Sequence, residues 1–128
     1  MLVVGLVLAG VAALIHVYIW LMESFAWTSA RARATFGTTP DEAEATRELA
    51  FNQGFYNLFL AIVAAVGIVL AAVGHTGVGA ALVLAGAGSM TAAGIVLLVS
   101  APSKAAAALK QLVPPLLAVV ALVVGLAL

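Results

Sequence analysis

The chain has 128 residues, of which 66% are hydrophobic and 8% are charged. A soluble domain carries roughly a quarter charged residues, so this composition excludes a water-soluble globule and makes a lipid bilayer the expected surroundings. Net charge is zero and cysteine is absent, which gives no reason to expect nucleic acid as a partner and excludes disulfides and thiolate metal sites.

Four apolar stretches are each long enough to cross a bilayer, which takes about twenty residues. They comprise residues 1–22, 49–73, 77–99 and 104–128. The first lacks the basic start and the small-residue cleavage site of a secretory signal, so we expect it to remain as a membrane span. The sequence therefore predicts an all-α fold in which residues 1–128 form one domain, a bundle of four transmembrane helices. Small residues in the third span would let two copies approach closely, so a homo-oligomer is a further expectation.

The second and fourth helices are expected to differ from a straight helix of membrane length. Thr39 and Pro40, followed by acidic residues, form the pattern of a capping box. A helix from Pro40 to Val73 would be about 51 Å long, which predicts a long second helix extending into the cytoplasm. A helix that began only at Pro114 would be about 22 Å long and too short to span. We therefore expect the fourth helix to begin near Ser103 and to kink at its prolines.

Charged side chains gather in or beside the first and third connections. The basic residues are Arg31, Arg33, Arg47, Lys104 and Lys110, and the acidic residues are Glu23, Asp41, Glu42, Glu44 and Glu48. In an up-and-down bundle both connections lie at one membrane face. The positive-inside rule makes that face cytoplasmic and puts both termini outside, in the cell inner (plasma) membrane.

Polar side chains from three helices meet in the same third of the bundle. Isolated polar groups are costly in hydrocarbon, so this gathering is a functional-site hypothesis. On the second helix Glu48, Asn52 and Tyr56 recur at every fourth residue and form one face, with Gln53 and Asn57 in the adjacent row. Three carboxamides within six residues exceed what helix packing requires, which favours the lining of a cavity. The predicted ligand-binding set comprises His16, Trp20, Glu23, Glu48, Asn52, Gln53, Tyr56, Asn57 and Gln111.

Each of these groups also has a structural interpretation. His16 and Glu48 are the candidate catalytic acid–base groups. His16 is equally compatible with a neutral ring bonded to an adjacent helix, and Glu48 with an ion pair to Lys104 or Lys110. Glu23 could pair with a nearby cation at the interface, and the aromatic residues could form an interfacial belt. No metal site is expected, and although a lone histidine could be an axial haem ligand, nothing in the spacing requires haem.

Three sequence patterns together are typical of one family. They are the run NQGFYNLFL from Asn52 to Leu60, His16-x-Tyr18 followed by Glu23 and Trp27, and Gln111 ahead of Pro114. On these residues the chain resembles the small bacterial membrane proteins known as domain of unknown function 1304, over essentially its whole length. The resemblance implies a four-helix membrane fold and no assigned activity.

The preferred functional hypothesis is an intramembrane pocket near the cytoplasmic face that binds or transforms a small lipophilic molecule. A small proton-coupled transporter is an alternative, although the outer halves of the spans are nearly devoid of polar side chains and so offer no continuous path. A structural or accessory subunit is the other alternative, with residues 24–39 as its docking surface. Whether the protein is an enzyme stays open at this point.

Overall fold

Six α-helices and one 3-10 turn make up most of the computed structural model, which describes residues 1–128. In chain order they are α1 (Leu2–Phe25), α2 (Ala30–Phe36), α3 (Pro40–Ala45), α4 (Arg47–Ala72), α5 (Thr76–Ser100), the turn η1 (Pro102–Lys104) and α6 (Ala105–Ala127). Four helical segments, α1, α4, α5 and η1 with α6, are long and apolar enough to span a membrane. The predicted all-α bundle of four membrane helices is confirmed, and the chain is a multi-pass membrane protein.

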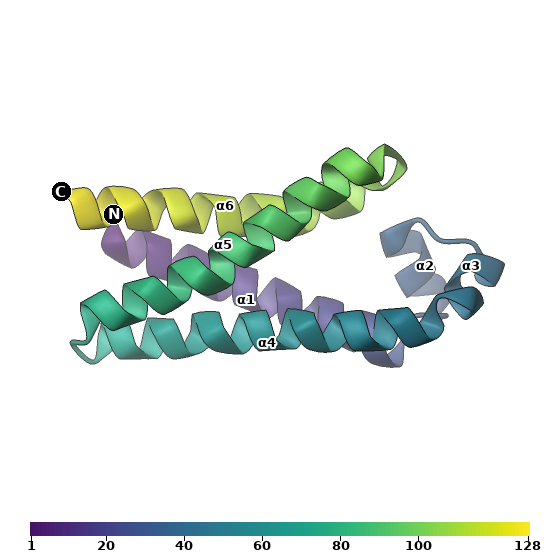
Figure 1. Ribbon diagram of the computed structural model, residues 1–128, viewed down its shortest axis with the longest axis horizontal. Coiled ribbons are helices and arrows are strands. Elements are labelled where there is room, and N and C mark those ends of the chain that lie inside the picture. The colour runs from purple at the N-terminus through teal and green to yellow at the C-terminus, as the bar shows by residue number, and fades with distance from the viewer.

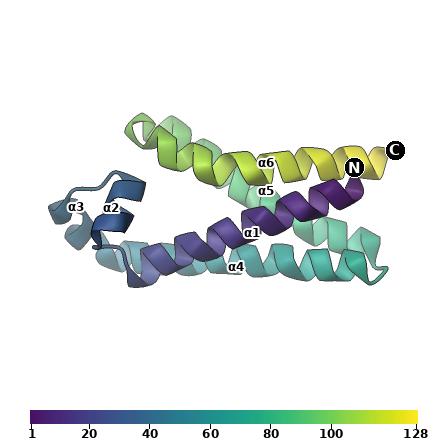
Figure 2. The same cartoon turned by 180° about the vertical axis from the view of Figure 1, so that it is seen from behind.

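The four long helices run alternately up and down. Helix α1 packs against α4 and α6, and α5 packs against the same two helices from the other side. Both termini and the turn between α4 and α5 lie at one end, called here the terminal end, as Figure 1 shows. At the other end, called here the charged end, lie α2, α3 and η1 (Figure 2). The charged side chains are in these segments or in the adjoining turns of the long helices.

Small side chains fill the inside of the bundle and large ones cover its outside. Most buried hydrophobic residues are alanines, whereas exposed positions include Val3 and Leu14, both 71% exposed. This distribution suits a lipid environment, because helices in hydrocarbon associate through close packing and not through the hydrophobic effect. Alanine and glycine inside allow that close approach, and valine and leucine outside meet the lipid.

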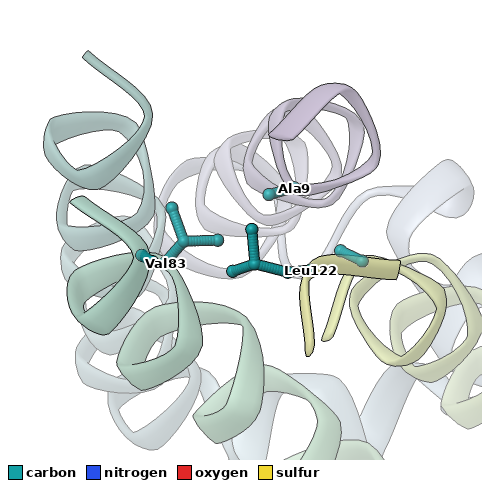
Figure 3. Packing of buried hydrophobic residues seen from close by; sticks show 5 residues of the cluster. Ala9, Val83 and Leu122 are labelled. Carbon is teal, nitrogen blue, oxygen red and sulfur yellow. The ribbon is translucent and has the colours of Figure 1, made fainter. Parts of the chain in front are cut away.

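The terminal end is tightly closed. Ala9, Val83 and Leu122 meet between three helices, as Figure 3 shows, and each is fully buried. Helix α1 touches α6 at Gly5, where an added Cβ would lie 2.7 Å from the backbone nitrogen of Leu122. Helix α4 touches α5 at Gly67, whose Cβ would lie 2.7 Å from the carbonyl oxygen of Gly79. A side chain larger than hydrogen at either crossing would force the two helices to shift.

At the charged end the close approaches involve different helix pairs. Helix α1 now touches α4, because a Cβ on Gly54 would lie 3.1 Å from the carbonyl oxygen of Trp20. Helix α5 touches α6, because a Cβ on Gly94 would lie 2.8 Å from the Cβ of Leu112. The pair α1–α4 and the pair α5–α6 lie apart at this end in both views (Figures 1 and 2).

The second predicted helix is divided in two at Thr46. The capping box is confirmed: the Glu42 amide donates to the Thr39 hydroxyl at 3.2 Å, and the Thr39 amide donates to the Glu42 carboxylate at 2.9 Å. The helix then breaks at Thr46 (φ −104°, ψ 6°) before α4 begins. The Thr46 hydroxyl donates to the Glu42 carbonyl at 2.6 Å and accepts from the Trp27 indole at 3.0 Å. A hydroxyl bonded back onto its own helix commonly bends that helix, and here Trp27, from the connection after α1, holds the hydroxyl in place.

The remaining helix limits differ from the expectations in small ways. Helix α1 continues to Phe25, three residues beyond the predicted end of its span, and the long first connection contains the short helix α2. Helix α6 is preceded by η1 and continues as a helix through Pro114 and Pro115.

Candidate functional site

A cavity of about 430 Å³ lies between the two helix pairs at the charged end. We call it the interior cavity. Its polar lining residues are Glu23, Trp27, Gln53, Asn57, Ser100, Lys104 and Gln111, and its apolar lining residues are Phe36, Ala93, Val96, Leu97 and Ala107. The polar and apolar groups together make a lining suited to an amphiphilic ligand.

A carboxylate and a carboxamide form the most buried polar contact in this cavity. The Asn57 side-chain nitrogen donates to the Glu23 carboxylate at 2.7 Å and to the Gln53 carbonyl at 3.2 Å. Glu23 is 9% exposed and Asn57 is 8% exposed. The single ion pair in the protein joins Arg47 to Glu44, so Glu23 has no cationic partner. Its second carboxylate oxygen makes no hydrogen bond and stays available to a molecule in the cavity.

The contact between α1 and α4 sets the position of this pair. Gly54 lets the backbone of α1 approach at Trp20 and Ser24. The Ser24 hydroxyl donates to the Phe51 carbonyl at 2.9 Å, which fixes the two helices in register. Glu23 precedes Ser24 and Asn57 lies one turn after Gly54, so both side chains reach the cavity from helices in direct contact.

Lys104 is the cation of the interior cavity. It lies at the end of η1, is partly buried, and forms no ion pair. A second cavity of about 340 Å³, called here the vestibule, also contains Lys104 in its lining, together with Glu23, Trp27 and Gln53. Because four residues line both spaces, the interior cavity and the vestibule are neighbours.

The vestibule is bounded by the first connection and α3. The Thr38 hydroxyl lines it, and this oxygen is buried with no hydrogen-bond partner. Glu42 lines it as well. The Thr39 amide and hydroxyl lower the pKa of Glu42 below its ordinary value by hydrogen bonding, and the charge of Lys104 lowers it further. Glu42 is therefore a carboxylate at neutral pH and contributes negative charge to the vestibule.

A family model described as "Protein of unknown function (DUF1304)" matches residues 10–123. The chain belongs to this family. The resemblance predicted from the sequence is confirmed, and the matched segment includes every residue that lines the interior cavity. No curated protein and no solved structure matches the chain. The DUF1304 description assigns no activity, so the function has to be argued from the site.

The two rows of polar residues on α4 have different surroundings in this DUF1304 bundle. Gln53 and Asn57 line the interior cavity. Asn52 is exposed and donates to the Glu48 carbonyl of its own helix at 3.0 Å, and Tyr56 is 65% exposed. Glu48 lines a separate surface depression. The structure thus brings Gln53 and Asn57 together with Glu23 and Gln111, while Glu48, Asn52 and Tyr56 lie outside the cavity.

His16 and Trp20 lie on α1 but do not line the interior cavity. His16 is 2% exposed, and its Nδ1 donates to the Ala12 carbonyl of the same helix at 2.9 Å. It lies about 10 Å deeper than Glu23 along the helix. Trp20 packs edge-on against Phe25 and Phe55, with ring centroids 5.6 and 5.9 Å away, and its indole nitrogen has no partner. Trp20 thus belongs to an aromatic cluster between α1 and α4.

Two residues that line the interior cavity, Lys104 and Phe36, are not in the ligand-binding set predicted from the sequence. The sequence predicts Lys104 only as an ion-pair partner for Glu48, whereas in the structure it lines the interior cavity together with Glu23 and forms no ion pair. Phe36 packs on Trp27 with ring centroids 5.1 Å apart and closes one side of the cavity. The position of Lys104, directly before the apolar part of the fourth span, could have indicated that it belongs to the site. No sequence pattern indicates a role for Phe36, because its position depends on how α2 packs against Trp27 in the folded protein. No three His, Cys, Asp or Glu side chains lie close enough together to hold a metal ion.

Proposed function

We propose that this protein binds a small amphiphilic molecule in the interior cavity. The observation that carries the proposal is the Glu23 carboxylate, which is buried, lacks a cationic partner and accepts one hydrogen bond, from Asn57. A buried carboxyl group with so few partners is costly unless a ligand or water completes its surroundings. The polar group of the ligand would bind Glu23, Asn57 and Gln53, within the reach of Lys104.

The apolar wall supports a ligand with a hydrocarbon part. Ala93, Val96 and Leu97 of α5 face Ala107 of α6 across the cavity lining. Val96 is 64% exposed, so this wall can be reached from outside the bundle. The volume of about 430 Å³ lies within the range of about 300–1,000 Å³ that small-molecule sites occupy. By the positive-inside rule the polar end of the ligand would lie near the cytoplasmic face.

Binding is better supported than transport or catalysis. A transport path would have to continue through the terminal end, where Ala9, Val83 and Leu122 leave no polar route. Of the two candidate acid–base groups, His16 is bonded to its own helix and Glu48 lies on the surface. The carboxylate in the cavity is Glu23, and its contacts suit recognition of a donor group.

Native mass spectrometry of the protein in mild detergent tests this proposal. We expect wild-type protein to retain a small-molecule mass distinct from phospholipid. Asn57→Leu should reduce the retained fraction at least tenfold, because it removes the donor to Glu23 and leaves that carboxylate unpartnered. Asn52→Leu is the matched control, since Asn52 lies on the same helix outside the cavity and should retain the ligand normally.

Two results would contradict the proposal. One is a wild-type protein that carries no small molecule. The other is equal retention by Asn57→Leu and Asn52→Leu. Both variants should show the wild-type elution volume, so that a loss of binding is not mistaken for unfolding.

A further inference from the structure

A further cavity of about 310 Å³ lies between α1 and α6, beside the end of α2. We call it the outer groove. Ile15, Ile19 and Met22 of α1 and Ala107 of α6 supply apolar walls. Tyr18 is 44% exposed and Lys110 is exposed, so the groove opens on the outside of the bundle. Both helices are membrane spans, and lipid is therefore the surrounding medium.

The charge in this groove has one sign. Lys110 is its single charged lining residue, and the lysine forms no ion pair. Lys110 lies about 9 Å further along the helix axis than Lys104, inside the span formed by η1 and α6. An ammonium in that position is costly unless it reaches water or an anion. No carboxylate lines the groove to supply that anion.

Helix α2 adds a second unpaired cation near the same groove. Thr35 lines the groove, and its hydroxyl donates to the Arg31 carbonyl at 2.9 Å. Residues four apart share a helix face, so Arg31 projects from the same side of α2 as Thr35. Arg31 is exposed and has no ion pair. The groove thus combines an apolar floor with positive charge at its rim.

We propose that the outer groove binds an anionic phospholipid of the surrounding membrane. One acyl chain lies along the apolar walls, and the phosphate lies at the Lys110 ammonium within reach of Arg31. Basic pockets between membrane helices select anionic head groups in this way. An apolar molecule would leave the ammonium unpaired, and a free anion would leave the apolar walls unused. The outer groove adjoins the interior cavity, because Phe36, Ala107 and Gln111 line both. The two differ in their charged lining residues, which are Lys110 in the groove and Glu23 with Lys104 in the interior cavity.

Lipid titration followed by native mass spectrometry tests the assignment. Protein stripped of lipid in an uncharged detergent is titrated with phosphatidylglycerol or phosphatidylcholine of the same acyl composition. Wild-type protein should bind phosphatidylglycerol about fivefold more tightly, the effect of one basic residue near a lipid phosphate. Lys110→Gln should remove this preference, and Lys110→Arg should keep it.

The matched control is Lys104→Gln, which removes a cation that lines the interior cavity and not the outer groove. It should leave the lipid preference unchanged. Ile15→Trp fills the groove and should weaken binding of both lipids alike.

Three results would overturn the proposal. The first is equal binding of the two lipids to wild-type protein, and the second is a preference that survives Lys110→Gln. The third is displacement of phosphatidylglycerol by an equal concentration of inorganic phosphate, which would show that Lys110 binds any anion and that the apolar walls contribute nothing.

Discussion

The two ends of the bundle are built from the same four helices and pack in opposite ways. At the terminal end three helices meet around Leu122, and backbones touch at Gly5 and Gly67. At the charged end α1 contacts α4 and α5 contacts α6, and a cavity lies between the pairs. The buried polar side chains all lie in the half nearer the charged end, namely His16, Glu23, Asn57 and Thr91. Close packing and buried polarity are therefore separated along the bundle axis.

This difference shows what small residues do in a membrane bundle. They allow close contact, but their positions decide which helices make it. Glycine at 67 and 79 brings α4 onto α5, and glycine at 54 brings α4 onto α1. One helix thus changes its nearest partner along its length, and the space opened by that change is available for a ligand.

The largest expected effect comes from removing packing at the terminal end. Leu122→Ala deletes a fully buried side chain, and we expect it to lower the free energy of unfolding by about 2–5 kcal/mol. Leu97→Ala makes the same chemical change in the wall of the interior cavity, where the side chain is only half-buried. It should cost less than about 1 kcal/mol, since a space is already present there. Unfolding in mixed detergent micelles measures both variants, and equal losses would show that the two ends are packed alike.

A smaller effect is expected from adding a methyl group at a helix crossing. In Gly79→Ala the new Cβ would lie 2.6 Å from the Gly67 carbonyl oxygen, and the shift needed to relieve it should cost about 1–3 kcal/mol. Gly88→Ala on the same helix meets nothing within 4 Å. It should be neutral or stabilising by up to about 1 kcal/mol, because alanine is the better helix former. Thermal unfolding of the two variants in one detergent compares them, and a Gly79→Ala protein as stable as Gly88→Ala would contradict the close crossing.

The smallest effect concerns pH at the charged end. The lowered pKa of Glu42 means that its carboxylate stabilises the start of α3 at neutral pH. This contribution is complete above the ordinary glutamate pKa of 4.5 and is lost as the pH falls through the lower pKa of the folded protein. The unfolding midpoint of Glu42→Gln should therefore depend less on pH between pH 6 and pH 3 than that of the wild type. The difference between the two proteins should be about 1–2 °C at most. Glu48→Gln is the control, because no hydrogen bond reaches the Glu48 carboxylate, and a flattening as large in this variant would argue against the capping box as the cause.

Part of the candidate site could be read from the sequence. Glu23, Gln53, Asn57 and Gln111 were expected near one another because helical spacing and the depth of each residue bring them to the same level. Spacing alone could not choose between the two rows on α4. That choice depends on the side of α4 that contacts α1, and the contact at Gly54 decides it.

The sequence by itself determined the four membrane helices, the capping box at Thr39 and the gathering of charge at one end. These features depend on the length of each apolar run and on interactions between residues close in the chain, which are local properties. The tertiary structure alone decided the break at Thr46, which a hydrogen bond from Trp27 holds, and the role of Lys104 in the cavity wall. Both depend on contacts between segments far apart in sequence, and in a bundle of small side chains those contacts follow from how closely each pair of backbones can approach.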